Sequence, residues 1–340
     1  MKKNIRIGTR ESQLAVWQAE QVKSLLAQHG YGSELVYIKS EGDIDLKTPL
    51  YEMGVQGVFT RSLDIALLNN QVDIAVHSMK DVPTQLAQGI VQAAVLKRGS
   101  HKDVLVPHPD LGDISKIFGR GSIGVEHVSI SKAGSQTKET TYVEKIDGGE
   151  KVNAIIATSS VRRRAQWLNR YPHHTIETLR GNVNTRLRKL KESNWHGAIF
   201  AAAGLERINL LPENSIELDW MLPAPAQGAI MVVCREDDDH CLQACIHFND
   251  VHTALCTRIE RDFLRTLLGG CSTPISGLAE INNNEVNFTG NILSPDGRLI
   301  ATLNASDLVA RAHEMGANAA NRLLANGGKA IADSIRNATK

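Results

Sequence analysis

The chain has 340 residues, of which 42% are hydrophobic, and this length favours two or three domains with sizeable cores over a single domain. Lysine and arginine number 38 and aspartate and glutamate 37, so the net charge of +1 argues against a protein whose whole surface attracts nucleic acid or an anionic membrane. The N-terminus lacks the apolar run of a secretory signal, and no apolar stretch reaches the roughly 18 residues of a membrane span. The number of cysteines, five, is odd. These three observations predict a cytoplasmic protein with reduced thiols.

Strands and helices alternate in the first part of the chain. Ile5 and Ile7 alternate with polar residues as in a strand, and Ser12 is suited to cap a helix whose apolar residues recur at helical spacing. A strand at 34–40, a loop at 54–57, a helix at 60–69 and a short apolar strand at 73–77 follow. This order predicts a parallel sheet covered by helices.

The same alternation returns after residue 150. Strands are predicted at 153–157, 175–179 and 196–202, and helices from Ser160 and from about Val183. A further apolar strand at 229–234 follows Pro223-Ala224-Pro225, which is typical of a connection and consistent with a return crossing between domains. The segment 108–150 is rich in glycine, serine, threonine and mixed charge, and we interpret it as a surface insertion.

From about Asp250 the pattern changes to one long helix and a run of hairpins. The helix is predicted at 253–268, and strands are predicted at 276–281, 285–293 and 298–304. A last helix is expected to start at Ser306, with these residues on one face: Leu308, Ala312, Met315, Ala319 and Leu323. The elements predict a small α+β domain with an antiparallel sheet.

The predicted fold is therefore α/β, with two α/β domains followed by the small C-terminal α+β domain. We place the first domain at 1–98 and 226–248, because the apolar strand at 229–234 follows the return crossing. The second domain is placed at 99–225, with an insertion at about 109–150, and the third at 249–340.

Arginine is concentrated in the second α/β unit, at the ends of its predicted strands. Seven arginines lie between Thr158 and Arg188, with Glu177 as the only acid. In open α/β sheets, ligands bind beyond the carboxyl ends of strands, where helix N-termini and loop amides converge. Small residues with free N–H groups stand at the same ends: Thr158, Ser159, Ser160, Gly181 and Asn182. Because guanidinium groups form paired hydrogen bonds with carboxylates and phosphates, the pattern predicts a cleft for several such anions.

Two other interpretations fit the arginine cluster. It could be a solvated basic surface, although the repetition at three strand ends (Arg162, Arg180 and Arg186) argues against this. It could also contact nucleic acid, with Trp167 and Tyr171 as stacking groups. The aromatic content of 4% and the low net charge are against that class of interface.

The first α/β unit shows the same theme in a weaker form. Arg10 and Ser12 follow the first strand, and Lys80 and Asp81 follow the strand at 73–77. In a cleft lined by arginine, the Asp81 carboxylate could stabilise a cation that forms during a reaction. It could equally be a helix cap or the ion-pair partner of Lys80.

One cysteine lies in an unusual setting. Cys271 follows Gly269-Gly270 and precedes Ser272-Thr273-Pro274, in a loop between domains where the glycines allow unusual backbone angles and can present the sulfur to a cleft. The other four are typical of small buried apolar residues: Cys234, Cys241, Cys245 and Cys256. These four cysteines are not accompanied by a second cysteine pair or by histidines at the spacing of metal ligands, so we predict no metal site.

Several longer motifs occur in order along the chain. They are Gly8-Thr9-Arg10-Glu11-Ser12, Asp73-Ile74-Ala75-Val76-His77-Ser78-Met79-Lys80-Asp81-Val82-Pro83, Thr158-Ser159-Ser160-Val161-Arg162-Arg163, Leu179-Arg180-Gly181-Asn182-Val183-Asn184-Thr185-Arg186, Ala203-Gly204-Leu205-Glu206-Arg207, Gln227-Gly228-Ala229 and Gly269-Gly270-Cys271. Together they resemble the porphobilinogen deaminase (hydroxymethylbilane synthase) family along nearly the whole chain. The chain departs from the family in a longer segment at 111–149 and in Ala157, where glycine often precedes Thr-Ser-Ser.

The resemblance implies a three-domain fold whose first two domains are similar to type II periplasmic binding proteins, with the chain crossing between them twice. It also implies one dipyrromethane cofactor per chain, thioether-linked to Cys271, and Asp81 as the catalytic residue. By position, the groups that bind the acetate and propionate side chains are Arg10, Ser12, Lys80, Arg162, Arg163, Arg180, Arg186 and Arg207. Thr158, Ser159, Ser160, Gly181, Asn182 and Gln227 complete the expected cofactor- and substrate-binding set.

The implied activity is that of a transferase of porphyrin and heme biosynthesis, which deaminates four porphobilinogen molecules and joins them head to tail into the linear tetrapyrrole hydroxymethylbilane. Loss of ammonia would leave a cationic azafulvene beside Asp81, and the two carboxylates of each unit would account for the arginine density. A monomer that binds neither nucleic acid nor membrane is expected. The main rival is a two-lobed anion-binding protein with the same fold and no catalysis, which the lack of an export signal disfavours.

Overall fold

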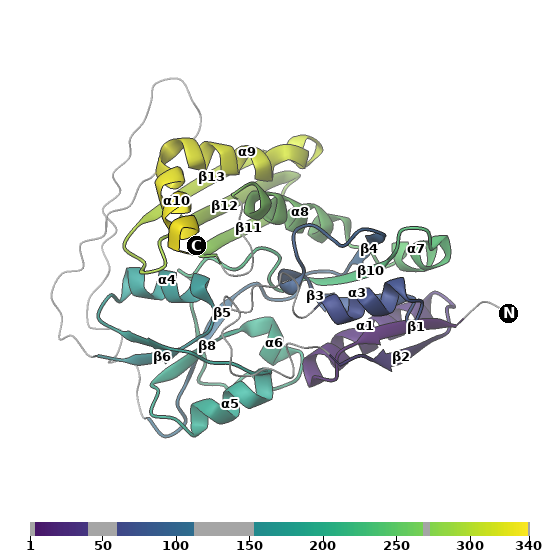
Figure 1. Ribbon diagram of the computed structural model, residues 1–340, viewed down its shortest axis with the longest axis horizontal. Helices are drawn as coiled ribbons and strands as arrows, with labels where there is room; N and C mark the ends of the chain where they lie inside the picture. Colours follow the sequence, from purple (N-terminus) through teal and green to yellow (C-terminus); the bar gives the residue numbers. More distant parts are fainter. Residues whose placement is uncertain (1–3, 40–59, 112–152, 268–272, 339–340) are drawn as a thin grey trace.

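The computed structural model describes residues 4–39, 60–111, 153–267 and 273–338, which form two α/β units side by side and a third unit packed against them (Figure 1). Most of the predicted insertion, the loop at 54–57 and Cys271 lie outside the described residues. Across these ranges, the structure contains no helix with the length and apolar character needed to span a membrane.

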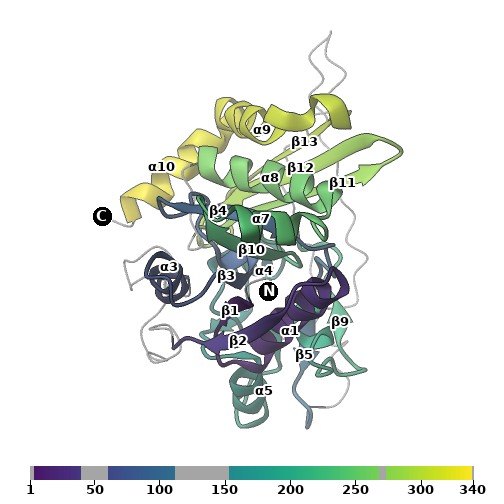
Figure 2. The same cartoon turned by 90° about the vertical axis from the view of Figure 1, so that its right-hand side faces the viewer.

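The first α/β unit is built on a five-stranded sheet in the order β2-β1-β3-β10-β4. Its strands are β1 (Ile5–Thr9), β2 (Ser33–Tyr37), β3 (Ile74–Ser78), β4 (Ile90–Val95) and β10 (Ile230–Arg235). Helices α1 (Gln13–Gln28) and α7 (Asp239–Ile246) pack on one face, and α3 (Arg61–Leu68) packs on the other, as Figure 2 shows for α1 and α3. The predicted strand–helix order of this unit is confirmed.

The second α/β unit repeats this plan in the order β7-β6-β8-β5-β9. Its strands are β5 (Asp103–Pro107), β6 (Ile155–Ala157), β7 (Thr175–Glu177), β8 (Gly197–Ala201) and β9 (Ile216–Glu217). Helix α4 (Val161–Arg170) covers one face through Trp167, whereas α5 (Val183–Lys191) covers the other through Leu190, and the short α6 (Ala202–Glu206) follows β8.

Each sheet contains one antiparallel strand, supplied by a segment that crosses between the units. β10 is antiparallel to β3 and β4, and β5 is antiparallel to β8. The chain crosses once between β4 and β5 and returns between β9 and β10, so the two-lobed fold expected from the resemblance is confirmed. The parallel pairing predicted from the alternation is confirmed for β1 with β2 and β3, whereas the antiparallel strands β10 and β5 were not predicted, because an apolar run of strand length is the same in either direction.

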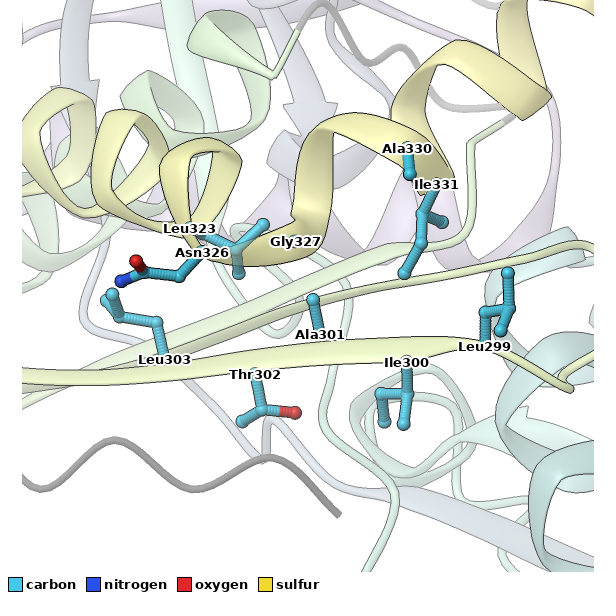
Figure 3. A pocket seen from close by; sticks show the side chains of 10 residues that line it. All are labelled: Leu299, Ile300, Ala301, Thr302, Leu303, Leu323, Asn326, Gly327, Ala330 and Ile331. Carbon is cyan, nitrogen blue, oxygen red and sulfur yellow. The ribbon is translucent and has the colours of Figure 1, made fainter. Parts of the chain in front are cut away.

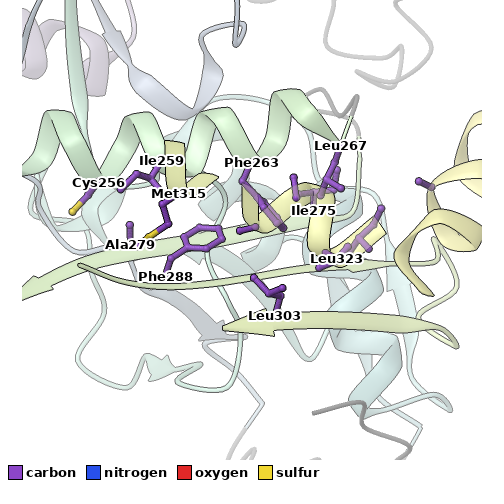
Figure 4. Close-up of a cluster of buried hydrophobic side chains, with 14 of the residues drawn as sticks. Cys256, Ile259, Phe263, Leu267, Ile275, Ala279, Phe288, Leu303, Met315 and Leu323 are labelled. Atoms are coloured by element: carbon purple, nitrogen blue, oxygen red, sulfur yellow. The ribbon is translucent and has the colours of Figure 1, made fainter. Parts of the chain in front are cut away.

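The third unit is a three-stranded antiparallel sheet covered by helices, as predicted. β11 (Ile275–Asn282), β12 (Glu285–Leu293) and β13 (Ile300–Leu308) form a meander, and α8 (Val251–Thr266), η3 (Val309–Glu314), α9 (Met315–Leu323), η4 (Leu324–Gly328) and α10 (Lys329–Ala338) complete the unit. The helix expected from Ser306 is wrong at its start, because β13 stays paired with β12 as far as Leu308 opposite Glu285. In the core, Phe263 meets Phe288 edge to face at 5.0 Å (Figure 4).

A buried carboxylate joins the third unit to both crossing segments. Glu260 of α8 is fully buried and receives two hydrogen bonds from the guanidinium of Arg98, at 2.6 and 3.1 Å. The same carboxylate accepts the backbone N–H groups of Ala226 at 2.6 Å and Ala279 at 2.8 Å. Arg98 lies in the first crossing and Ala226 in the second, so one side chain ties together the segments about which the two lobes would turn.

Candidate active site

The carboxyl ends of β1 and β3 surround a small hollow in the first unit. Its polar lining consists of Arg10, Ser12, Gln18, Thr60, His77, Ser78 and Asp81. The Ser12 hydroxyl caps α1 by accepting the backbone N–H of Ala15 at 3.4 Å. Asp81 ends the short turn η1 (Met79–Asp81), is exposed, and is the only acid among the described residues of the lining. A carboxylate and a guanidinium thus face one polar space.

Lys80 connects the turn η1 to the second unit. Its Nζ donates to Gln227 Oε1 at 3.1 Å, and Gln227 Nε2 donates in turn to Asp103 Oδ1 at 2.9 Å. Burial and repulsion by Arg163 lower the pKa of Lys80 to about 8, an effect that Asp81 and Asp103 partly oppose. The Lys80 ammonium therefore belongs to a polar network that links the two lobes.

Asp103, the first residue of β5, is a central acid that the sequence did not reveal. It is fully buried and pairs with Arg162 and Arg163, each at 2.7 Å. The two guanidinium groups also donate to backbone carbonyls, Arg162 to Leu222 O at 2.7 Å and Arg163 to Ile199 O at 2.9 Å. Burial alone would raise the pKa of Asp103, but the two arginines hold it well below its ordinary value. Two arginines of the expected binding set are therefore engaged inside the protein.

Replacing Asp103 with asparagine is expected to destabilise the protein by about 3–5 kcal/mol, because two buried guanidinium groups would lose their counter-charge. Since the pKa of Asp103 is lower in the folded than in the unfolded chain, its stabilisation is present above the unfolded pKa of about 4 and is lost as the pH falls below it. Urea unfolding of both proteins at pH 7, and of wild type also at about pH 3, measures both effects. An Asp103→Asn variant as stable as wild type at pH 7 would contradict this account.

Arg180 and Arg186 follow the next strand of the second lobe, Arg180 in the loop after β7 and Arg186 on α5. Arg180 is 5% exposed, and Arg186 Nε donates to Gly181 O at 2.7 Å. Burial, with repulsion by Arg163 and Arg180, lowers the pKa of Arg186 to about 10, and Asp81 opposes this change. Asp81 of the first lobe therefore interacts with a cation of the second lobe as well as with Lys80.

Small polar residues of the predicted set build the loops that carry these arginines. The Ser160 side chain caps α4, and the Asn182 side chain caps α5. Ser159 Oγ donates to Leu179 O at 2.6 Å, and Thr158 Oγ1 accepts the backbone N–H of Ser160 at 3.2 Å. Their side chains therefore fix the two strand-to-helix turns.

Arg207 lies between the lobes. Its Nη2 donates to Gly228 O of the second crossing at 2.7 Å, and its guanidinium carbon lies 5.6 Å from the ring centre of Trp17 in α1. Burial lowers the pKa of Arg207, which the nearby Glu206 opposes. The structure thus places this residue at an interlobe contact beside the crossing.

A second residue that sequence reasoning missed holds the turn that carries Lys80 and Asp81. Arg261 of α8 donates through Nη1 to Val82 O at 2.9 Å and through Nη2 to Pro83 O at 2.5 Å, with a longer contact to Met79 O at 3.4 Å. These carbonyls lie on both sides of Lys80–Asp81. Since Arg261 is far from the turn in sequence, no local pattern could have revealed the contact.

The four described cysteines are poor nucleophiles, because all are buried. Burial raises the pKa of Cys234 to about 11 and the pKa values of Cys245 and Cys256 to about 12, and it also raises that of Cys241. Reaction requires the thiolate, so none of the four is suited to attach a group. Cys271, the predicted attachment residue, lies outside the described residues.

Another hollow lies in the third unit, between β13 and the break that joins α9 to α10 (Figure 3). Apart from Thr302 and Asn326, its lining is apolar, with Leu299, Leu303 and Ile331 among the side chains around it. It offers no charged group to an anion, so the polar hollow beside Asp81 is the better candidate site.

Comparison with known proteins gives a consistent result. The family model "Porphobilinogen deaminase, dipyromethane cofactor binding domain" matches residues 5–243, and the model of the porphobilinogen deaminase C-terminal domain matches residues 254–325. The porphobilinogen deaminase of Trichlorobacter lovleyi is 36% identical over 98% of this chain and 97% of its own, and that of Desulforamulus reducens is 36% identical over 99% of each. The chloroplastic enzyme of Oryza sativa is 35% identical over 98% of this chain and 86% of its own.

Some solved structures share a distant likeness with this chain. A nutrient-binding protein from Burkholderia cenocepacia bound to methionine is 13% identical, with a TM-score of 0.38 over 71% of this chain and 90% of its own. Such a likeness says nothing about function. The full-length sequence similarity and the two matched models are decisive instead: this chain belongs to the porphobilinogen deaminase family.

Proposed function

We propose that this enzyme deaminates four porphobilinogen molecules and joins them head to tail into hydroxymethylbilane, on a dipyrromethane primer linked through a thioether to Cys271. The observation that carries the proposal is the position of Asp81. It is one exposed carboxylate at a polar hollow, and it interacts with cations of both lobes. Family membership supplies the substrate, and the dipyromethane-binding model covers both lobes.

The residues present fit a primer that carries several carboxylates. Burial lowers the pKa values of Lys80 and Arg186, so both cations gain when an anion approaches. When bound, the dipyrromethane supplies the pyrrole carbon to which the first substrate unit is added. Helix α8 ends at Thr266, a few residues before Cys271, and Arg261 of the same helix holds the turn that carries Asp81.

The expected binding residues divide into two groups by their contacts. We assign direct carboxylate binding to Arg10, Lys80, Arg180 and Arg186, with Ser12 at the N-terminus of α1. Arg162 and Arg163 would have to exchange Asp103 for a substrate carboxylate, so we assign them mainly a supporting positive potential. Thr158, Ser159, Ser160, Gly181, Asn182, Arg207 and Gln227 then position the loops, the crossing and Lys80.

Asp81 has the central chemical role. As the C–N bond of porphobilinogen breaks and ammonia leaves, positive charge develops on the methylene carbon and the pyrrole ring. A fixed carboxylate beside that charge stabilises the transition state by an amount that is typically about 3–4 kcal/mol for a key electrostatic group. The surrounding cations bind the substrate carboxylates, whereas the Asp81 carboxylate faces the developing positive charge, so that the two kinds of charge do not compete for one place.

The polymer grows in a cleft between lobes, so we expect the two crossings to act as hinges during elongation. We propose domain limits at 1–98 with 226–248, at 99–225 and at 249–340, with an insertion at about 109–150. After the first crossing β5 joins the sheet of the second lobe, and after the return β10 joins the sheet of the first lobe, which supports these limits. The chain is proposed to act as a cytoplasmic monomer that binds neither nucleic acid nor membrane.

Ehrlich's reagent tests the proposed function against a binding protein of the same fold. Purified enzyme treated with the reagent in acid is expected to turn pink, because a dipyrromethane is attached, and to consume porphobilinogen at a steady rate. A protein that stays colourless and consumes no porphobilinogen would be a receptor, and the proposed function would be wrong.

Arg261→Met is expected to lower kcat about ten- to a hundredfold, because charge-assisted hydrogen bonds that hold the Asp81 turn are lost. The bound primer is expected to remain, and Arg261→Lys should restore part of the rate. Arg265→Met is the matched control on the same helix, since Arg265 is exposed and pairs only with Asp262 among the described residues. Equal kcat in the Arg261→Met and Arg265→Met variants would contradict the positioning role.

A further inference from the structure

His77 is a buried polar side chain that faces the hollow beside Asp81. It lies on β3, opposite Met231 of β10, and is 6% exposed. It lines the hollow together with Arg10 and Asp81. None of the hydrogen bonds formed by the described residues reaches its ring nitrogens. Buried polar groups in native proteins usually have partners, so an imidazole left open toward a binding hollow points to a ligand.

The surroundings keep this imidazole neutral. Burial and the charge of Arg10 lower the pKa of His77 to about 4. The other elements around the hollow contribute hydroxyls and an amide, from Ser12 and Gln18 on α1 and from Thr60 before α3, and the remaining charge is the Asp81 carboxylate. One ring nitrogen of a neutral imidazole is a hydrogen-bond acceptor.

The hollow therefore offers three different groups to an occupant: a guanidinium, a carboxylate and a neutral acceptor. A ligand that complements all three carries an anion at one end and a cationic or N–H donor at the other. Porphobilinogen has this form, with carboxylates on its side chains and an ammonium on its aminomethyl group. Arg10 suits a carboxylate, which leaves Asp81 and His77 for the donor end.

Resting on the proposed function, we propose that His77 accepts a hydrogen bond from the aminomethyl ammonium of the incoming porphobilinogen and so helps to bind that end of the substrate. In the reaction the C–N bond breaks with its electron pair on nitrogen, ammonia leaves, and the methylene carbon keeps the positive charge. The imidazole takes no proton. A neutral acceptor binds the ammonium group less tightly than a second carboxylate would. It therefore opposes the loss of the nitrogen as uncharged ammonia less strongly.

The test compares porphobilinogen with an analogue that carries a methyl group in place of the aminomethyl group. His77→Leu is expected to raise KM for porphobilinogen about tenfold and to change kcat less than about threefold, because it removes one hydrogen bond to a charged group. The dissociation constant of the analogue, measured by calorimetry, is expected to stay within about twofold of wild type. His77→Gln, which keeps an acceptor at similar volume, is expected to restore KM to within about threefold.

Two results would overturn this role. A KM that is unchanged in His77→Leu would show that the imidazole contacts no part of the substrate. Equal weakening of porphobilinogen and the analogue would show that His77 only shapes the hollow or binds a carboxylate. His77→Asn, which is too short to reach, replaces the leucine variant if thermal melting shows that the latter is unfolded. Failure of the proposed function can be distinguished from failure of this role. In that case the wild-type protein would neither consume porphobilinogen nor bind the analogue.

Discussion

Cys271→Ala is expected to yield a folded protein without a dipyrromethane adduct and without detectable polymerising activity. The four thiols that the structure describes cannot replace it, because Cys234, Cys241, Cys245 and Cys256 are buried with raised pKa values. Intact mass before and after incubation with porphobilinogen measures attachment, and formation of hydroxymethylbilane measures activity.

Cys256→Ala is the matched control for this variant. Cys256 is 6% exposed at the edge of the third unit's core, so its loss removes one small apolar side chain and no reactive group. The control should keep both the adduct and the activity. A Cys271→Ala protein that still carries a mass increment of two pyrrole units would place the attachment elsewhere.

Asp81→Ala is expected to keep the bound primer and to lower turnover by at least about a hundredfold. The carboxylate is the group that offsets the positive charge formed when ammonia leaves, and the loss of one such electrostatic group typically reduces kcat about 10²–10³-fold. Stability should change little, because Asp81 is exposed. Single-turnover kinetics with porphobilinogen, on protein whose adduct has been verified by mass, measure the effect.

Asp307→Ala serves as the control for Asp81→Ala, since this aspartate lies on β13 of the third unit and pairs with Arg311. Its turnover is expected to equal that of wild type. If the Asp81→Ala protein carries the primer and turns over normally, the role given to Asp81 is refuted, and the cation must be stabilised by another group.

Local sequence patterns predicted the elements that depend on local physics. Ser12 caps α1 as expected, because an N-cap needs only the next three residues to be helical. Helix α5 similarly begins after Asn182, at the predicted position. The arginine cluster was correctly placed at strand ends, since strand–helix alternation fixes which loops share an edge.

What the sequence could not show depends on partners that are distant along the chain. Asp103 contacts Arg162 and Arg163 about sixty positions later, and Glu260 contacts Arg98 over a still longer separation. The sequence held one indication of the buried ion pair, a single acid at the start of the apolar strand Asp103–Pro107. A carboxylate buried with such a strand needs a cation as its partner. The predicted start of the last helix was wrong for the same reason, since pairing with β12 extends β13 past Ser306.

Intact mass spectrometry of the wild-type chain, with and without porphobilinogen, tests the central claim most directly. We expect the purified protein to exceed its sequence mass by two pyrrole units, and to show a ladder of up to four further units after brief exposure to substrate. A chain that keeps its plain sequence mass before and after exposure would contradict the claim that this cleft builds a polypyrrole on a covalently held primer.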